Sequence, residues 1–228
     1  MPFMQTFIFG HTSNLLPIPA YRFGHSGTRA LILGGVHGDE IEGVWAAHGL
    51  LEKFTESFPF QLQLTLVPAF NLDGVLARDR RNARGVDLNR NLPTHDWSSG
   101  PPASERYSPG PSAGSEPENQ ALIKFIETHK PQFILSLHSW KPMLNVNGHC
   151  RPEAEEISRR TGYSIEEDIG YPTPGCLGTY AGLEREMPTL TYEIERGLPC
   201  DQVLSIHVPA IYEAMKVSER RGVSGFQS

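Results

Sequence analysis

A histidine and a glutamate stand three residues apart in the segment LGGVHGDEIEG, residues 33–43. The first half of this segment is apolar, like the end of a buried strand, and the second half is typical of the first turn of a helix. Open α/β sheets usually bind ligands where a strand end faces a helix N-terminus. His37 and Glu40 are therefore either two ligands of a metal ion or parts of an ordinary polar turn.

A third candidate ligand, His138, ends the apolar run FILSLH, residues 133–138. If this run is a strand parallel to the one before His37, both strand ends lie at the same edge of the sheet. Three ligands from histidine and glutamate, with a fourth position kept for water, are typical of a catalytic zinc site. The alternative is that His138 is an ordinary histidine at the edge of the core.

The segment RRNARGVDLNRNLP, residues 80–93, contains four arginines and three asparagines around a glycine. Guanidinium groups bind carboxylates through two parallel hydrogen bonds, so this segment is suited to hold an anionic substrate group. The alternative is a solvated charged loop. Asp87 in the same segment could accept a hydrogen bond from the free ring nitrogen of a ligating histidine.

The elements that must position these residues are predicted from short apolar runs. Four such runs, each bounded by turn residues, predict interior strands at residues 29–36, 63–70, 133–138 and 189–194. Between the first two, a helix is predicted from helical spacing of Ile41, Val44, Trp45, Leu51 and Phe54. A shorter helix is predicted over residues 152–162, and a last one is capped by Asp201 and kinked or restarted at Pro209.

A further helix is predicted from a capping box with proline at the first helical position, formed by Ser115, Pro117 and Glu118. It runs to about residue 128. The preceding residues 71–114 are rich in Arg, Asn, Pro, Gly and Ser and lack periodicity. Because this segment is too long for a plain connection, it is predicted to be a functional loop region.

The composition describes one soluble globular domain that spans residues 1–228. A net charge of −6 without a basic block argues against a nucleic-acid partner, and no run approaches the roughly 18 apolar residues of a membrane helix. The N-terminus lacks an export pattern, and the three cysteines are widely spaced. We therefore expect a cytoplasmic protein.

Five segments carry a resemblance to a known family. HGDE, GVDLNRN, GSEPE, LSLHS and TYEI occur over residues 30–197 in the order found in the zinc carboxypeptidases, the M14 metallopeptidases. The chain length and the run GYPTPGCLGTYAG resemble the murein peptide amidase branch of that family. The resemblance implies a zinc carboxypeptidase-like α/β fold, with a mixed, mostly parallel central sheet flanked by helices.

The resemblance also implies site residues. One Zn²⁺ per chain would be held by His37, Glu40 and His138. The substrate carboxylate would be held, and the scissile carbonyl polarised, by Arg80, Asn89 and Arg90. Asp87 would be the partner behind the first zinc histidine. The family register RxNxxGVDLNRN favours Arg80 over its neighbour Arg81.

The general base of the family is a glutamate on a late strand, and its aromatic-Glu-aliphatic pattern selects Glu193 over Glu195. The alternation of side chains between the two faces of a strand does not distinguish them, because side chains two residues apart point the same way. Tyr171, nine residues before Tyr180, matches the family's substrate-capping tyrosine relative to an aromatic of the pocket wall. Asp39 stands where digestive carboxypeptidases have an arginine, so their peptide-binding subsites are not assumed.

The implied activity is zinc-dependent hydrolysis of an amide next to a free carboxylate in a small peptide. The implied bond is the γ-D-glutamyl–diaminopimelate amide of murein peptides, cleaved during cell-wall recycling. One alternative is an N-acyl amino acid deacylase of the succinylglutamate desuccinylase or aspartoacylase type. A second is a zinc-binding module without catalytic activity. The sequence does not determine the oligomeric state.

Overall fold

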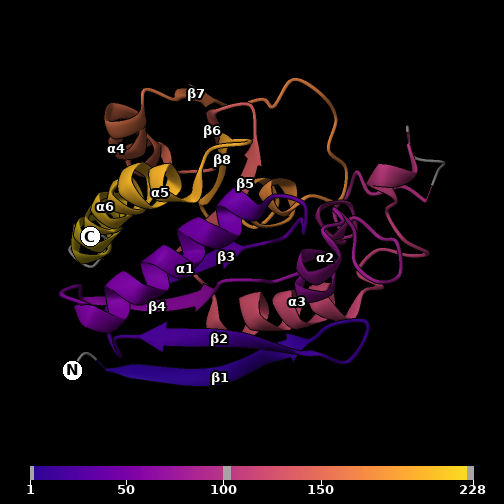
Figure 1. The fold of residues 1–228 in the computed structure, drawn as a ribbon, viewed down its shortest axis with the longest axis horizontal. Helices are drawn as coiled ribbons and strands as arrows, with labels where there is room; N and C mark the ends of the chain where they lie inside the picture. Colours follow the sequence, from indigo (N-terminus) through magenta and orange to yellow (C-terminus); the bar gives the residue numbers. More distant parts are fainter. Residues whose placement is uncertain (1–2, 100–103, 225–228) are drawn as a thin grey trace.

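The computed structural model describes residues 3–99 and 104–224 of the chain. Within these residues one eight-stranded sheet runs through the molecule, and helices cover both of its faces (Figure 1). The strands are β1 (Met4–His11), β2 (Pro17–Phe23), β3 (Thr28–Gly34), β4 (Leu62–Val67), β5 (Phe133–Trp140), β6 (Met143–Asn147), β7 (Ser164–Glu166) and β8 (Thr189–Glu195).

The helices differ in length and type. The α-helices are α1 (Ile41–Glu56), α2 (Leu72–Ala77), α3 (Pro117–His129), α4 (Arg151–Thr161), α5 (Cys200–Gln202) and α6 (Val208–Ser224). Two short 3-10 segments are η1 (Leu88–Arg90) and η2 (Glu105–Tyr107), and two π-helical segments are η3 (Gly178–Leu183) and η4 (Val203–His207). No helix within the described residues is long and apolar enough to cross a membrane.

The strand order in the sheet is β1-β2-β4-β3-β5-β8-β6-β7. The central strands β4, β3, β5 and β8 are parallel to one another, whereas antiparallel pairs join β1, β2 and β6 to the sheet. The chain passes from β3 through α1 to β4 and later returns to the other side of β3 as β5. The carboxyl ends of β3 and β5 therefore form the topological switch point, where open α/β sheets bind ligands.

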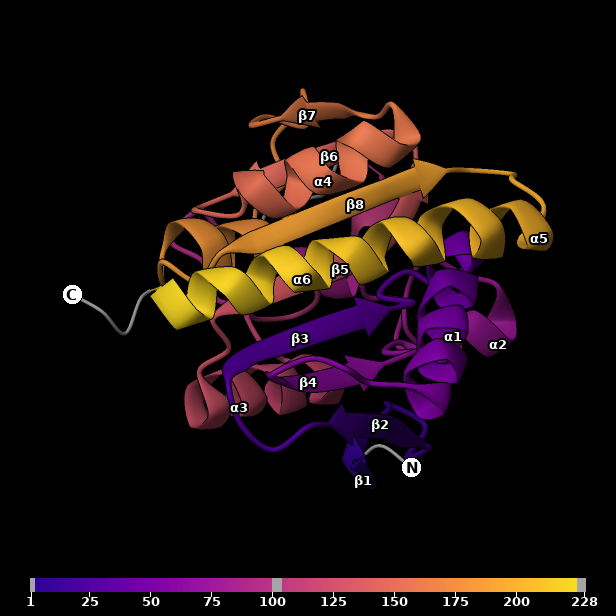
Figure 2. The ribbon, with the colours of Figure 1, turned by 90° about the vertical axis from the view of Figure 1, so that its left-hand side faces the viewer.

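Side chains of the central strands alternate between two hydrophobic cores. In β3, Ala30 and Ile32 belong to the core beneath α1, α4 and α6, whereas Leu31 and Leu33 belong to the core beneath α3 and η3. Figure 2 shows α1, α4 and α6 on the near side of the sheet and α3 on the far side. Because both faces are covered, these strands are apolar throughout.

The predicted α/β fold with a mixed sheet is confirmed, and the four predicted strands are the parallel ones at its centre. The sequence analysis missed β1, β2, β6 and β7, which lie toward the two edges of the sheet. The predicted loop region of residues 71–114 is only partly irregular, because it contains α2, η1 and η2.

Two predicted helix starts were wrong in detail. The residue that caps α3 is Glu116 and not Ser115, and its side chain makes no capping hydrogen bond. Ser115 instead donates to the Glu116 carboxylate and accepts from Asn91 Nδ2. Asp201 lies within the first turn of α5 and does not cap it, and the helix restarts as α6 next to Pro209, as predicted.

His207 is a buried histidine at the end of η4, outside the candidate ligand set. Its Nδ1 is hydrogen-bonded to the Tyr192 hydroxyl, and the ring centroid of Tyr163 lies 5.5 Å from its own. Burial lowers the pKa of His207 to about 4. The folded state therefore holds the neutral imidazole, whereas a histidine in an unfolded chain titrates near pH 6.5.

We expect His207 to make the fold sensitive to acid. The contribution of the neutral His207 ring to the free energy of unfolding is complete above about pH 6.5. It is lost as the pH falls toward about 4, and the loss is at most about 3 kcal/mol. His207→Gln keeps a hydrogen-bonding group but cannot titrate. In thermal unfolding with EDTA, the Tm of this variant should fall less than that of the wild type between about pH 7.5 and about pH 4.5. Equal decreases in Tm would contradict the prediction.

Candidate active site

Two strand ends and one helix start bring the candidate ligands together. His37 lies three residues after the end of β3, Glu40 directly precedes α1, and His138 lies near the end of β5. The turn between β3 and α1 passes very close to α2, because a Cβ atom at Gly38 would lie 1.9 Å from the backbone carbon of Gly74. Only glycine allows this packing, which fixes the turn that carries the first two ligands.

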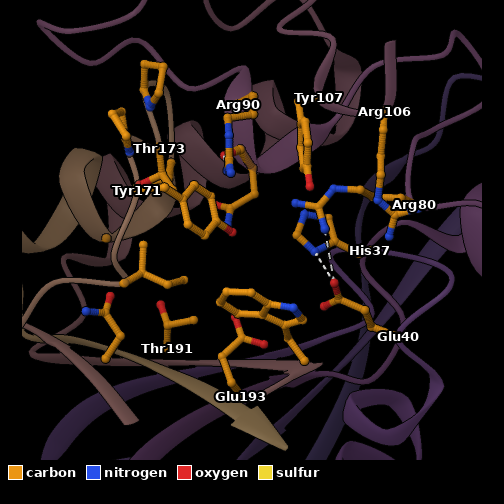
Figure 3. Close-up of a pocket in the computed structure, with 18 of the residues that line it drawn as sticks. His37, Glu40, Arg80, Arg90, Arg106, Tyr107, Tyr171, Thr173, Thr191 and Glu193 are labelled. Carbon is orange, nitrogen blue, oxygen red and sulfur yellow. Dashed lines mark hydrogen bonds and ion pairs between the residues drawn. The ribbon is translucent and has the colours of Figure 1, made fainter. Parts of the chain in front are cut away.

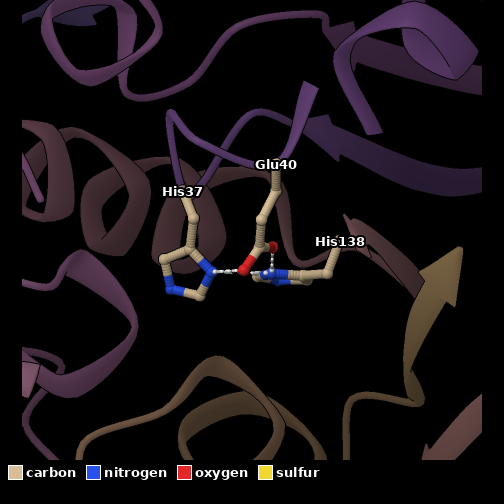
Figure 4. Close-up of side chains that lie close together, drawn as sticks. All are labelled: His37, Glu40 and His138. Carbon is tan, nitrogen blue, oxygen red and sulfur yellow. Dashed lines mark hydrogen bonds and ion pairs between the residues drawn. The ribbon is translucent and has the colours of Figure 1, made fainter. Parts of the chain in front are cut away.

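The three side chains point at one another in the buried centre of the site (Figure 4). His37 Nδ1 lies 2.9 Å from Glu40 Oε1, and His138 Nδ1 lies 2.9 Å from Glu40 Oε2. All three residues offer ligand atoms within 4.8 Å of one another, so one metal ion could contact them all. Glu40 makes no side-chain capping bond to α1, and its Oε2 accepts from the Ser139 N–H at 3.2 Å. The polar-turn alternative therefore does not describe Glu40.

Each candidate histidine ligand is oriented by a second hydrogen bond. His37 Nε2 lies 3.0 Å from Asp87 Oδ1, and His138 Nε2 lies 2.9 Å from Ser136 Oγ. An ionised carboxylate can only accept, so Nε2 of the neutral His37 ring donates and Nδ1 keeps a lone pair for a metal. The residues present thus fit the tetrahedral zinc site of a hydrolase, with three protein ligands.

Asp87 and Arg80 form a buried ion pair behind the ligands. Arg80 Nε donates to Asp87 Oδ2 at 2.8 Å, and Arg80 Nη1 donates to Glu40 Oε1 at 3.1 Å. Burial acts to raise the pKa of Asp87, but it is outweighed by the charge of His37 when that ring is protonated, by the charge of Arg80 and by the hydrogen bond from His37, which lower that pKa. The pKa of Glu40 is likewise lowered against burial, by His37 and His138. Both carboxylates therefore remain ionised at neutral pH.

The structure separates two pairs of neighbours that the sequence left open. Arg80 is buried among the candidate ligands, whereas Arg81 pairs with Asp79 at 3.1 Å at a partly exposed position. Glu193 is buried and lines the cavity over the ligands, whereas Glu195 is exposed at the end of β8. Geometry thus favours Arg80 and Glu193 as the residues that can reach a substrate.

A cavity of about 820 Å³ opens over the ligands, and Glu193 points into it (Figure 3). Parallel pairing of β5 and β8 places Glu193 opposite His138. Burial raises the pKa of Glu193 to about 7, with a further contribution from the charge of Glu40. Its Oε2 has no hydrogen-bond partner within the described part of the chain. Such a carboxylate is suited to accept and return a proton near neutral pH.

Asn89 and Arg90 line the same cavity and present hydrogen-bond donors to it. Asn89 Oδ1 accepts from the Leu177 N–H at 2.8 Å, so its Nδ2 group is left to donate. Arg90 is buried, with its guanidinium 5.6 Å from the ring centroid of Tyr107. Among residues 3–99 and 104–224, no carboxylate forms an ion pair with it. These donors fit a carboxylate supplied by a ligand.

Tyr171 also lines the cavity, and its partly exposed ring contacts Trp140 edge-on, with the centroids 5.7 Å apart. Tyr180, which the sequence analysis placed on the pocket wall, is instead buried in the core beneath α3. The Arg185 guanidinium covers its ring at 3.6 Å from the centroid. The spacing between the two tyrosines therefore did not locate a second aromatic of the cavity.

Several cavity residues were not predicted from the sequence: Arg106, Tyr107, Trp140, Asn145, Asn147, Thr191 and Arg196. For Thr191 a signal existed, because it lies two residues before Glu193 and so on the same side of the strand. Alternation in LNVN, residues 144–147, likewise places two asparagines on one side of β6. For Arg106 no pattern existed, since it lies in an irregular segment.

Comparison with known proteins agrees with this geometry. The sequence model of the zinc carboxypeptidase family matches residues 3–192. The chain belongs to this family. It is 31% identical over 197 residues to murein peptide amidase A of Vibrio campbellii, covering 81% of this chain and 76% of that protein. It is 34% identical over 161 residues to murein peptide amidase A of Escherichia coli K12, covering 66% and 64%.

The fold of this protein also resembles that of a solved structure. The murein-tripeptide amidase MpaA from Escherichia coli O157 superposes with a TM-score of 0.74 at 24% identity, covering 94% of this chain and 91% of that one. This likeness confirms the predicted zinc carboxypeptidase-like fold. Together with the family match, it identifies the protein as a hydrolase.

We expect this family member to bind one zinc ion per chain, and His138→Ala to remove most of it. The reason is that a three-ligand site loses a third of its protein ligands with this change. Metal analysis after dialysis should find about one zinc in the wild type and much less in His138→Ala. His95→Ala is the control, because the His95 side chain is 92% exposed. Equal zinc in all three proteins would remove His138 from the ligand set.

Proposed function

We propose that the protein is a zinc-dependent amidase that cleaves the γ-D-glutamyl–diaminopimelate amide of short murein peptides. One observation carries the hydrolytic part of this proposal. The cavity over the ligand set of His37, Glu40 and His138 also contains a buried carboxylate, Glu193, and the guanidinium of Arg90, which has no acidic partner in the described part of the chain.

The chemistry follows from these groups. A bound zinc would lower the pKa of a water molecule and polarise the scissile carbonyl. Glu193, whose pKa burial raises to about 7, can take a proton from the attacking water and pass it to the leaving amine. Arg80 can stabilise negative charge on the carbonyl oxygen, because its guanidinium lies in the wall of the same cavity.

The leaving part of the substrate is placed by its own carboxylate. Asn89 Nδ2 and the Arg90 guanidinium are the donors that would hold it, and Arg90 is already fixed by a 2.7 Å bond from its Nη1 to the Asn89 carbonyl. Holding the carboxylate in this way positions the adjacent amide for attack. Tyr171 can close over the bound group, because its ring lies at the partly exposed rim.

Part of the remaining wall of the cavity supports a polar leaving residue. Beside apolar groups such as Ile169 and Pro174, it includes four neutral polar side chains, namely Asn145, Asn147, Thr173 and Thr191. Asn147 Oδ1 is buried without a hydrogen-bond partner in the described part of the chain. A zwitterionic side-chain end, such as that of diaminopimelate, would satisfy amide groups that an apolar side chain would leave unpaired.

The two murein peptide amidases at 31% and 34% identity support the choice of substrate. Cleavage of such peptides during cell-wall recycling, in the cytoplasm, belongs to the same proposal. The deacylase alternative uses a related zinc chemistry, so only a comparison of substrates separates the two.

A panel of three substrate classes tests the proposal. The murein tripeptide L-Ala-γ-D-Glu-diaminopimelate should be cleaved with a kcat/KM at least about a hundredfold above that of peptides ending in hydrophobic residues and of N-acetyl or N-succinyl amino acids. Faster cleavage of either of those two classes would replace the murein assignment and leave the zinc hydrolase assignment standing. No hydrolysis in any class, by protein that contains zinc, would favour a binding module without catalytic activity.

We expect Glu193→Gln to lower kcat by at least about a hundredfold while zinc content is kept, because the proton acceptor is lost and no ligand is changed. The matched control is Glu195→Gln, which changes an exposed carboxylate two residues further along β8. Its kcat should stay within about twofold of the wild type. If kcat fell more in Glu195→Gln than in Glu193→Gln, the base would be Glu195 and the prediction would be wrong.

A further inference from the structure

Asp39, which lies between the two first metal-ligand candidates, binds two arginines from distant parts of the chain. Arg106 Nη2 donates to Asp39 Oδ2 at 2.7 Å, and Arg196 Nη1 lies 3.5 Å from the same oxygen. Arg106 comes from η2, and Arg196 directly follows β8. The backbone of Arg196 is fixed by a 3.1 Å hydrogen bond from its N–H to the Trp140 carbonyl.

This cluster of Asp39, Arg106 and Arg196 carries an excess of positive charge. One carboxylate faces two guanidiniums, and both arginines approach the same oxygen atom. Two further carboxylates lie near Arg196. Glu193 lines the same cavity, and Glu40, at 3.6 Å, already contacts Arg80 and both candidate histidine ligands. An added anion between Arg106 and Arg196 would therefore meet uncompensated donors.

Arg106 lines the cavity on the side away from the proposed leaving-group pocket, and Arg196 meets it at Asp39. Figure 3 shows Arg106 on one side of His37, and Tyr171 and Thr191 on the other. A smaller polar groove continues outward from Arg106. The described residues that line it are all charged: Asp39, Arg78, Asp79, Arg80, Arg81, Glu105 and Arg106. A substrate whose leaving part lies beneath Tyr171 must place its acyl part on this charged side.

We propose that Arg106 and Arg196, held by Asp39, bind a second substrate carboxylate on the acyl side of the scissile amide. This inference rests on the proposed function and specifies a second substrate group that the site recognises. In a γ-glutamyl amide the free α-carboxylate lies four bonds from the scissile carbonyl carbon, about 5 Å away. Arg196 Nη2 lies 3.6 Å from a carboxylate oxygen of Glu40, so its guanidinium is beside the candidate ligands at which the amide would be cleaved.

In an ordinary α-linked peptide, a carboxylate lies at this distance only when the acyl residue is glutamate, because most other side chains carry no such group. The Arg106–Asp39–Arg196 cluster would thus favour substrates whose acyl residue carries a free carboxylate four bonds from the scissile carbonyl carbon. Asp39 acts as a positioning residue, since it fixes the guanidiniums and does not itself meet the substrate. Its negative charge also leaves the cluster with about one net positive charge, which one carboxylate neutralises.

The test compares the tripeptide L-Ala-γ-D-Glu-diaminopimelate with an analogue in which only the α-carboxylate of D-Glu is a carboxamide. For wild-type enzyme loaded with zinc, kcat/KM should be about 10- to 100-fold higher for the acid, mainly through a lower KM. Arg106→Gln should reduce this ratio to within about threefold of unity, and Arg106→Lys should restore part of it. Arg159→Gln, on the exposed face of α4, is the matched control and should keep the wild-type ratio.

The outcomes separate this inference from the function on which it rests. Equal cleavage of both substrates by the wild type would overturn the acyl-side site and leave the amidase assignment intact. A merely structural role of Arg106 would lower cleavage of acid and carboxamide by the same factor, and an unchanged ratio in Arg106→Gln would therefore also overturn the inference. Cleavage of neither substrate, with zinc bound, would overturn the proposed function and the inference together.

Discussion

The buried carboxylate of Asp87 is the group on which the geometry of the site depends. Its two oxygens accept hydrogen bonds from His37 Nε2 and Arg80 Nε, and Oδ1 also accepts from the Asn89 N–H at 2.9 Å. One side chain thereby orients a metal-ligand candidate, a guanidinium and the first turn of η1. A buried charge is stable only when such partners surround it. Loss of any partner would therefore move the others, because they share the same anion.

The sheet explains why so many charged groups can meet inside a small protein. The strand order reverses between β3 and β5, and side chains from the segment before η1, Arg80 and Asp87, contact the candidate ligands at this point. Backbone hydrogen bonds anchor the chain on both sides of η1, including those from Asp87 N–H to the Ser108 carbonyl and from Leu92 N–H to the Gly175 carbonyl. Irregular backbone can therefore position side chains at the site.

The sequence predicted what is local or periodic and missed what depends on irregular contacts. The four central strands were found because a strand covered on both faces is a continuous apolar run. The edge strands were missed, since β7 has three residues and β1 is largely exposed. The candidate ligand positions followed from strand ends, and the family's aromatic-Glu-aliphatic pattern selected Glu193. The contact of Arg106 with Asp39 joins residues 67 positions apart through a loop without periodicity, so no sequence pattern could indicate it.

The charges of the cavity also differ in how firmly the protein holds them. The whole chain carries a net charge of −6, yet four arginines line this one cavity. Arg80 is buried and bound by two carboxylates, so it belongs to the fixed framework around the ligands. Arg90 is buried and has no acidic partner among the residues that the structure describes, whereas Arg106 and Arg196 are partly exposed and share one. A positive cavity in a negative protein concentrates small anions at that point. The arginines thus differ in burial and in the number of carboxylates that bind them. Arg80 shapes the site, whereas the other three can bind a charged substrate.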